Sequence, residues 1–386
     1  MKKPISIYIH IPFCIKKCNY CDFLSAPADR RTQEEYLRVL EGEIQRQAKH
    51  YRDYAVETVY IGGGTPTAVP CEKLCHMLRI LFQSFQVEAG AEVSMEANPG
   101  TVGREALFCY QEAGINRISM GLQSASDREL KQLGRIHSYA DFLESYELAQ
   151  KAGFHNINVD LMAALPEQKA ADYADTVKKV LSLTPKPAHI SAYSLMIEEG
   201  TYFYERYGEE WEHMAHTGEA SAHLPSEEEE REMYRLTERL LSKAGYHRYE
   251  ISNYSLSGYE CRHNRVYWER GDYVGFGLGA ASMVNNVRFR NTPDLRAYME
   301  KEEKTVERVQ LTVQEQMEEF MFLGLRLVEG VERKAFQADF GVPIEEVYGE
   351  VIEKNVREGL LISGERIALT AKGTDFGSYV SAQFLQ

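Results

Sequence analysis

The chain has 386 residues, 44% of them hydrophobic, which is enough for a packed core of more than one domain and too many for a disordered protein. Its formal net charge of −14 argues against a free-standing nucleic-acid-binding protein, which usually presents a basic surface. No stretch approaches the roughly 18 apolar residues that span a bilayer, and the N-terminal MKKPISIYIHIPFC alternates like a strand without a signal-peptide cleavage site, so we expect a cytoplasmic protein with no integral membrane segment.

The first half of the chain repeats one unit, a short apolar strand followed by a turn and an amphipathic helix. Strands are predicted at 5–11, 57–61, 92–97, 117–122, 156–162 and 188–194. Helices are predicted at 32–50, 70–85, 102–113, 126–133, 138–152 and 170–183. This alternation predicts a parallel sheet with helices outside. Six units fall short of the eight in a complete barrel, so the expected fold class is α/β, a partial (β/α)6 barrel of the TIM type.

Within these strands one face is apolar and the other polar. In the fifth strand, Ile157, Val159 and Leu161 oppose Asn158 and Asp160, because side chains alternate with a period of two. A strand buried between two apolar layers would be apolar on both faces. We therefore expect the polar face to line a ligand-holding interior. The alternative, an antiparallel sheet with one wet face, is disfavoured by the intervening helices.

The rest of the chain is less regular. Residues 200–260 are rich in acidic residues and tyrosine, and Ser226 with Glu229 predicts a capping box for a helix that ends near Gly245. A helical stretch at Gln314–Val328, two shorter helices and a hairpin suggest an acidic, winged-helix-like docking module. The predicted domains are a core at 1–225, an extension at 226–305 and a C-terminal domain at 306–386.

The seven cysteines include a crowded group. Cys14, Cys18 and Cys21 follow the first strand, so they lie at the carboxyl end of a parallel strand, where such folds place active sites. Three thiolates leave one iron of a four-iron cluster open to a ligand. A zinc site completed by His10 or a remote cysteine is one alternative, and three incidental thiols are another. The spacing resembles the radical S-adenosylmethionine (SAM) superfamily, which implies a [4Fe-4S] cluster on these cysteines and SAM on the open iron.

Longer motifs refine this resemblance over nearly the whole chain. IYIHIPFCIKKCNYCDF, YIGGGTPT, MEANPG, RISMGLQS, LGRIHS and HNRVYW are similar to those of the coproporphyrinogen III dehydrogenase-like group. Glycines that follow a strand allow close approach of a ligand, carboxylates and amides can bind ammonium or ribose groups, and a guanidinium can pair with a carboxylate. The resemblance implies SAM contacts at Tyr8, Tyr20, Gly63, Gly64, Thr65, Glu96, Gln123, Arg135 and Asp160.

Three features favour the heme-chaperone branch of this group over its dehydrogenases. Phe23 stands where dehydrogenases carry a fourth cysteine, the first cysteine comes too early for their N-terminal extension, and residues 263–268 match an HNxxYW motif. Histidine is a common heme ligand, and Tyr and Trp offer flat faces to a porphyrin. The resemblance implies heme contact by His263, Tyr267 and Trp268, with Cys261 as a competing ligand.

The expected function is therefore heme binding and transfer to an unidentified acceptor protein, with an electron donor needed if SAM is cleaved. The alternative is an oxygen-independent coproporphyrinogen III dehydrogenase, and a radical enzyme acting on another substrate is a third possibility. Two local expectations remain. Residues 275–279, GFGLG, predict close backbone packing near the barrel mouth. Ala164 stands where relatives usually have glycine, which predicts a local difference in that loop.

Overall fold

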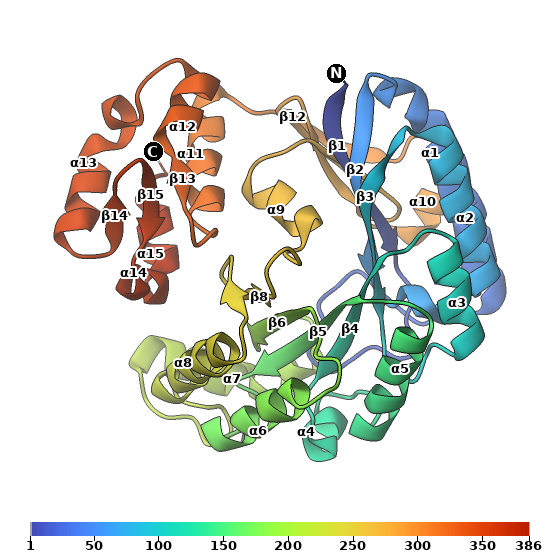
Figure 1. Ribbon diagram of the computed structural model, residues 1–386, viewed down its shortest axis with the longest axis horizontal. Coiled ribbons are helices and arrows are strands. Elements are labelled where there is room, and N and C mark those ends of the chain that lie inside the picture. The colour runs from blue at the N-terminus through green and yellow to red at the C-terminus, as the bar shows by residue number, and fades with distance from the viewer. Residues whose placement is uncertain (1, 386) are drawn as a thin grey trace.

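The predicted strand–helix units form an open barrel in the computed structural model, which describes residues 2–385 (Figure 1). The first six strands are parallel and adjacent in sequence order, which confirms the partial barrel. They are β1 (Lys3–Ile11), β2 (Tyr54–Gly63), β3 (Val87–Ala97), β4 (Arg117–Gln123), β5 (Asn156–Ala163) and β6 (His189–Ser194). The helices outside them are α1 (Arg30–Gln47), α2 (Cys71–Ser84), α3 (Arg104–Glu112), α4 (Asp127–Gln132), α5 (Tyr139–Lys151) and α6 (Ala170–Leu181).

The alternation in β1 explains how the wall of the barrel is held together. Ile7 and Ile9 point outward into the main core, which also contains Leu37 and Leu40 of α1, and all four side chains are buried. Each such burial contributes roughly 1.5–3 kcal/mol. The opposite, polar face of each strand is left for the interior of the barrel.

The sheet continues beyond both edges of the six-stranded core. At one edge β9 (Tyr273–Phe276) pairs with β1, followed by the antiparallel strands β10 (Ala281–Val284), β11 (Val287–Asn291) and β12 (Thr305–Gln310). At the other edge lie β8 (Asn253–Ser255) and β7 (His247–Arg248). The helix α10 (Leu295–Glu300), which precedes β12, packs near α1. The sheet therefore reaches Gln310, so the domain boundary that we predict at 306 falls within β12.

Two helices follow β6. The helix α8 (Glu227–Lys243) begins at the predicted residue, where the Ser226 hydroxyl accepts a hydrogen bond from the Glu229 backbone N–H. The predicted capping box is only half formed, because the Glu229 carboxylate pairs with Lys169 Nζ at 3.1 Å. It packs beside α6 (Figure 1). The helix α7 (Tyr202–Thr217), in contrast, forms in a segment that we expected to be irregular. Its Phe203 and Tyr207 are buried in a small apolar cluster that is separate from the main core and also contains Leu133 and Leu165.

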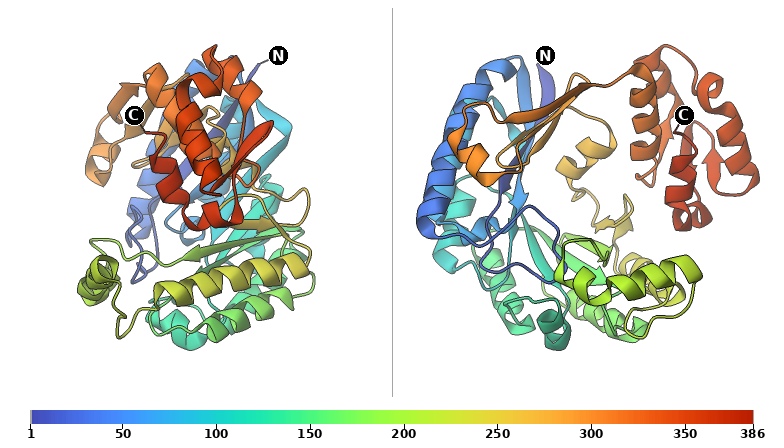
Figure 2. Two further views of the ribbon diagram at one scale, coloured as in Figure 1. Left: turned by 90° about the vertical axis from the view of Figure 1, so that its left-hand side faces the viewer. Right: turned by 180° about the vertical axis from the view of Figure 1, so that it is seen from behind.

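The C-terminal part has a separate hydrophobic core, and it stands across the open side of the barrel from α1 and α2 (Figure 2). As expected, helices precede a hairpin, and a third strand joins it. Its elements are α11 (Val313–Gly324), β13 (Val331–Glu332), α12 (Arg333–Phe340), α13 (Ile344–Arg357), β14 (Leu361–Ser363), β15 (Arg366–Leu369), α14 (Ala371–Asp375) and α15 (Gly377–Ala382). No helix within residues 2–385 combines the length and the apolar character needed to cross a membrane.

Candidate functional site

A cavity of about 470 Å³ opens at the carboxyl ends of the barrel strands. Three cysteines and most of the residues predicted to contact SAM line it together, although they come from six separate segments of the chain. These lining residues are Cys14, Cys18, Cys21, Tyr20, Gly63, Gly64, Thr65, Glu96, Gln123, Arg135 and Asp160. Tyr8 is not among them.

The three thiols lie on the loop after β1. The Thr65 hydroxyl donates to Cys14 Sγ at 3.5 Å, and Arg135 Nη1 donates to Cys18 Sγ at 3.6 Å. Burial raises the pKa of the Cys21 thiol, and the neighbouring Cys18 and Cys14 raise it further. Within residues 2–385, no three His, Cys, Asp or Glu side chains converge on one point as the ligands of a single ion do. In a four-iron cluster, each thiolate binds a different iron, so the three sulfurs need to share a cavity and need not share one point.

The glycine segment after β2 brings the backbone against the cysteine loop. Gly63 has φ +113°, and a Cβ on it would lie 2.5 Å from the His10 ring. A Cβ on Gly64 would lie 2.7 Å from the Phe13 carbonyl oxygen. Neither position has room for a side chain, and Gly63 is required by its backbone conformation as well.

Glu96, at the end of β3, is held on both oxygens. Its Oε1 accepts from the Tyr60 hydroxyl and its Oε2 from the Gly63 backbone N–H, each at 3.1 Å. Burial and then the nearby Asp160 raise the pKa of this carboxyl to about 7. A bound cation would favour the ionised form, so the pocket offers Glu96 as a partner for an ammonium group.

Asp160 and Gln123 complete the polar side of the cavity. Asp160 Oδ1 accepts from Asn158 Nδ2 at 2.7 Å, its Oδ2 accepts from the Ser119 hydroxyl at 3.2 Å, and burial raises its pKa. Gln123 ends β4 with φ +70°, next to a shift in the pairing of β4 with β5. This left-handed residue turns the chain at the carboxyl end of β4, where Gln123 lines the cavity.

Asn98 is a site residue that our sequence analysis did not single out. Its Nδ2 donates to the Thr65 hydroxyl at 2.8 Å, and its Oδ1 accepts from Arg135 Nη2 at 2.8 Å. The amide thus joins the glycine segment to the arginine. Among residues 2–385, the buried Nε of Arg135 has no hydrogen-bond partner. This donor fits a carboxylate ligand. The position of Asn98 directly after the third predicted strand was the signal that could have identified it.

Two tyrosines predicted as SAM contacts have different surroundings. Tyr20 lines the cavity beside Arg135, and burial raises its pKa. The Tyr8 hydroxyl lies 3.0 Å from His10 Nδ1, and the other ring nitrogen of His10 binds the Leu24 carbonyl oxygen at 2.8 Å. Tyr8 therefore helps to hold His10, which supports the wall of the pocket behind the cysteine loop.

The HNxxYW motif forms the helix α9 (Arg262–Trp268), which lies across the open side of the barrel (Figure 1). Glu92 of β3 accepts the backbone N–H groups of Arg262 and His263 at 3.0 and 3.3 Å, which anchors the start of the helix. His263 is 1% exposed, and burial lowers its pKa to about 3, so the ring is neutral. None of His263, Tyr267 and Trp268 lines the cavity.

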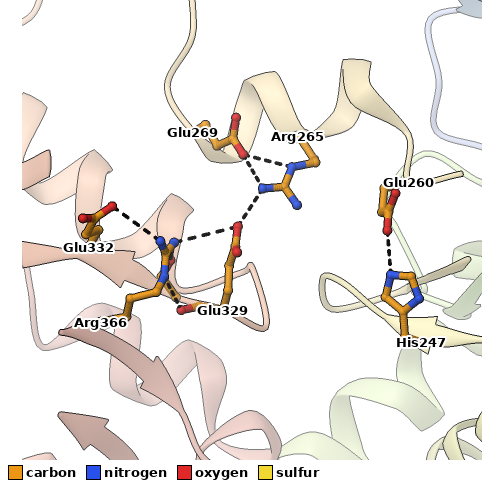
Figure 3. Close-up of polar contacts among 8 residues, drawn as sticks. His247, Glu260, Arg265, Glu269, Glu329, Glu332 and Arg366 are labelled. Atoms are coloured by element: carbon orange, nitrogen blue, oxygen red, sulfur yellow. Dashed lines mark hydrogen bonds and ion pairs between the residues drawn. The ribbon is translucent and has the colours of Figure 1, made fainter. Parts of the chain in front are cut away.

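The outer side of α9 meets the C-terminal part (Figure 3). Arg265 Nη2 donates to Glu329 Oε1 at 2.6 Å, and the same carboxylate oxygen lies 3.8 Å from Arg366 Nη2. The Arg326 guanidinium covers the Trp268 ring at 4.3 Å from its centroid. The two ends of the motif therefore contact different parts of the molecule. His263 faces the barrel, and Trp268 faces the C-terminal part.

The mouth of the cavity carries exposed apolar groups beside basic ones. Phe23 is 59% exposed and Met196 is 69% exposed, and both line the cavity. Lys16 and Lys17 line it as well, together with the acidic residues Asp22 and Glu198. The exposed apolar groups suit a flat apolar ligand, and the two lysines can pair with acidic substituents on it.

Two further expectations concern the backbone. The predicted close packing near residues 275–279 is confirmed, because a Cβ on Gly277, which has φ +102°, would lie 2.6 Å from the His10 carbonyl oxygen. Ala164 has φ +58°, a left-handed conformation that glycine adopts more easily. The loop after β5 thus keeps a glycine-like backbone despite the alanine.

Comparison of the sequence with known proteins identifies its family and several relatives. The family model of the radical SAM superfamily matches residues 8–180, and that of the HemN C-terminal domain matches residues 311–376. The heme chaperone HemW of Lactococcus lactis is 35% identical over 100% of this chain and 98% of its own. HemW of Bacillus subtilis is 35% identical over 98% and 99%, and HemW of Escherichia coli is 34% identical over 93% and 92%.

A solved structure shares the fold. The coproporphyrinogen III oxidase HemN of E. coli, described as a radical SAM enzyme, superposes with a TM-score of 0.85 over 100% of this chain and 91% of its own. The two sequences are 22% identical, so this likeness concerns the fold alone.

Proposed function

The chain belongs to the family of the heme chaperone HemW and carries a radical SAM domain, and on that premise we propose that it binds heme and passes it to an acceptor protein. The radical SAM domain implies a [4Fe-4S] cluster and SAM as cofactors. The observation that carries the proposal is the rim of the cavity, where exposed Phe23 and Met196 adjoin Lys16 and Lys17. Apolar side chains can cover a porphyrin face, and the two ammonium groups can pair with its carboxylates.

We assign the cluster to Cys14, Cys18 and Cys21, and SAM to the polar side of the same cavity. When bound together, the cluster and SAM supply one-electron chemistry at the SAM sulfonium. Glu96 would accept from the SAM ammonium, and the free Nε of Arg135 would donate to the SAM carboxylate. The remaining contacts proposed are Tyr20, Gly63, Gly64, Thr65, Gln123 and Asp160, whereas Tyr8, which does not line the cavity, would act through the wall that it supports.

We also propose that heme contacts His263, Tyr267 and Trp268 after a conformational change of α9. His263 and Tyr267 bind each other, and Trp268 lies under Arg326, so this contact requires α9 to leave its place in the barrel. A heme held at the rim needs no such rearrangement. We also propose a cytoplasmic location, an unidentified acceptor protein, an electron donor if SAM is cleaved, and no nucleic-acid partner.

Anaerobic titration of the cluster-loaded full chain with heme tests the function. We expect saturable binding, followed by transfer to a heme-free globin added as a generic acceptor. Phe23→Glu and Met196→Glu are each expected to weaken heme binding about tenfold, since they place a charge against an apolar ligand. Val306→Glu, at an exposed apolar position on β12, is the matched control. Conversion of coproporphyrinogen III to protoporphyrinogen IX by the same preparation would instead establish the dehydrogenase alternative.

A further inference from the structure

His263 is fixed inside the barrel by both of its ring nitrogens. The Thr58 hydroxyl donates to Ser6 Oγ at 2.7 Å, so its single proton is used and it accepts from His263 Nδ1, also at 2.7 Å. The Nε2 lone pair then accepts from the Tyr267 hydroxyl at 2.8 Å. The nitrogen that could bind iron is therefore already engaged, in a ring that solvent does not reach.

The face of this ring is placed against the wall of the SAM pocket. His263 stacks on Tyr60 with ring centroids 5.2 Å apart and planes 27° from parallel. Tyr8, the neighbour of Tyr60 in register on β1, flanks the same phenol at 6.4 Å. Tyr60 in turn donates to Glu96, whose second oxygen is held by the Gly63 backbone N–H. A continuous series of contacts thus runs from α9 to the carboxylate assigned to the SAM ammonium.

We propose that His263 is a positioning residue of the SAM pocket, which fixes the Tyr60 phenol so that its hydroxyl holds Glu96 in place. This inference rests on the proposed role of Glu96 toward SAM and does not depend on where heme binds. Without the imidazole, Tyr60 loses the nearer of its two stacking partners and can rotate within the space left behind. The Tyr60 side chain then also adopts orientations in which its hydroxyl does not reach Glu96. The pocket is therefore less ordered before SAM binds.

The test is equilibrium dialysis of SAM against the anaerobic, cluster-loaded full chain, with a heme titration of the same samples. His263→Ala and Tyr60→Phe are each expected to weaken SAM binding about tenfold, the size of one hydrogen bond lost from a buried carboxylate. The double variant should bind SAM about as well as Tyr60→Phe alone, because His263 acts through the Tyr60 hydroxyl. The positioning role predicts this loss of SAM affinity in His263→Ala whatever the heme titration shows, and the heme titration reports separately whether His263 also contacts heme. Tyr254→Phe, a buried tyrosine of β8, is the matched control for Tyr60→Phe.

Two results would overturn the inference. One is SAM affinity of His263→Ala within twofold of wild type, and the other is additive losses in the double variant. If His263→Ala keeps its SAM affinity and loses heme binding, His263 is a heme ligand. If His263→Ala fails to fold, Tyr267→Phe decides the matter, since it removes only the hydrogen bond to Nε2 and should weaken SAM binding by a smaller factor. Failure of the wild-type protein to bind heme would overturn the proposed function and leave the SAM measurements decisive for His263.

Discussion

Arg135 and Asn98 are joined by a hydrogen bond of 2.8 Å from the guanidinium Nη2 to the amide Oδ1. The same Nη2 donates to the Gly121 carbonyl oxygen at 2.6 Å, so the guanidinium is oriented before any ligand arrives. Through the other end of its amide, Asn98 also holds Thr65 of the glycine segment. One side chain therefore sets the distance between two parts of the pocket that are far apart in sequence.

Replacing Asn98 with alanine should weaken SAM binding about tenfold, because Arg135 loses one of the two acceptors that orient its Nη2 and Thr65 loses its link to the arginine. The cluster content should stay close to wild type, since Asn98 does not contact a cysteine. Equilibrium dialysis with SAM and an iron assay measure the two quantities. Asn116→Ala is the control, because Asn116 binds the backbone of β3 at the opposite end of the barrel. An equal loss of SAM affinity in both variants would contradict the specific role of Asn98.

Replacing Cys18 with alanine should remove most of the cluster's visible absorbance after anaerobic reconstitution, because two thiolates and solvent hold a four-iron cluster poorly. Cys75→Ala should retain it. Cys75 lies on α2, with its sulfur 3.1 Å from that of Cys109, and neither residue lines the cavity. A complete cluster in the Cys18 variant would refute the ligand assignment.

The pKa of about 7 for Glu96 predicts a pH dependence of SAM binding. Below pH 7 the carboxyl is protonated in the free protein and must lose its proton to bind an ammonium group. Affinity should therefore rise about tenfold per pH unit up to pH 7 and level off above it, until the amino group of SAM loses its own proton at about pH 8. Dialysis at pH 6, 7 and 8 measures this rise. The Glu96→Gln variant should bind SAM more weakly and show a flat profile.

The same shift affects the stability of the cofactor-free protein. The pKa of Glu96 is near 4.5 in the unfolded chain and about 7 in the folded one, so the folded state holds the extra proton between these values. Wild type should lose roughly 3 kcal/mol of unfolding free energy relative to Glu96→Gln as the pH rises from 4.5 to 7. Urea unfolding at several pH values tests this, and a constant difference would contradict the shift.

Replacing Ala164 with glycine should stabilise the protein by about 0.5–1 kcal/mol. Glycine removes the strain of an alanine in the left-handed conformation, and this gain in free energy exceeds the cost of the greater conformational entropy that glycine gives to the unfolded chain. Its neighbour Ala163 ends β5 and provides the matched control. Ala163→Gly should destabilise by about 0.5–1 kcal/mol. Urea midpoints compare the two variants, and a loss of stability in Ala164→Gly would contradict the strain.

The sequence by itself determined the barrel and the residues around its cavity. Regular alternation placed six strands and six helices within a few residues of their observed bounds, and strand polarity identified the inward face of β5. Cys14, Glu96 and Asp160 could be grouped because the carboxyl ends of parallel strands meet at one edge. Local periodicity is enough for such elements, since each buries one face against its neighbours.

Tertiary structure alone decided the parts that lack such a pattern. The strands β9 to β12 are short, and their pairing depends on the free edge of β1. The helix α9 has seven residues and is held by Glu92, Thr58 and Tyr60, which lie between 170 and 205 positions earlier in the chain. From the sequence, heme contact by His263 follows only from the family resemblance, and the motif by itself does not distinguish a packed residue from a surface one. Only the folded chain encloses it, because burial depends on which distant segments come to lie around a side chain.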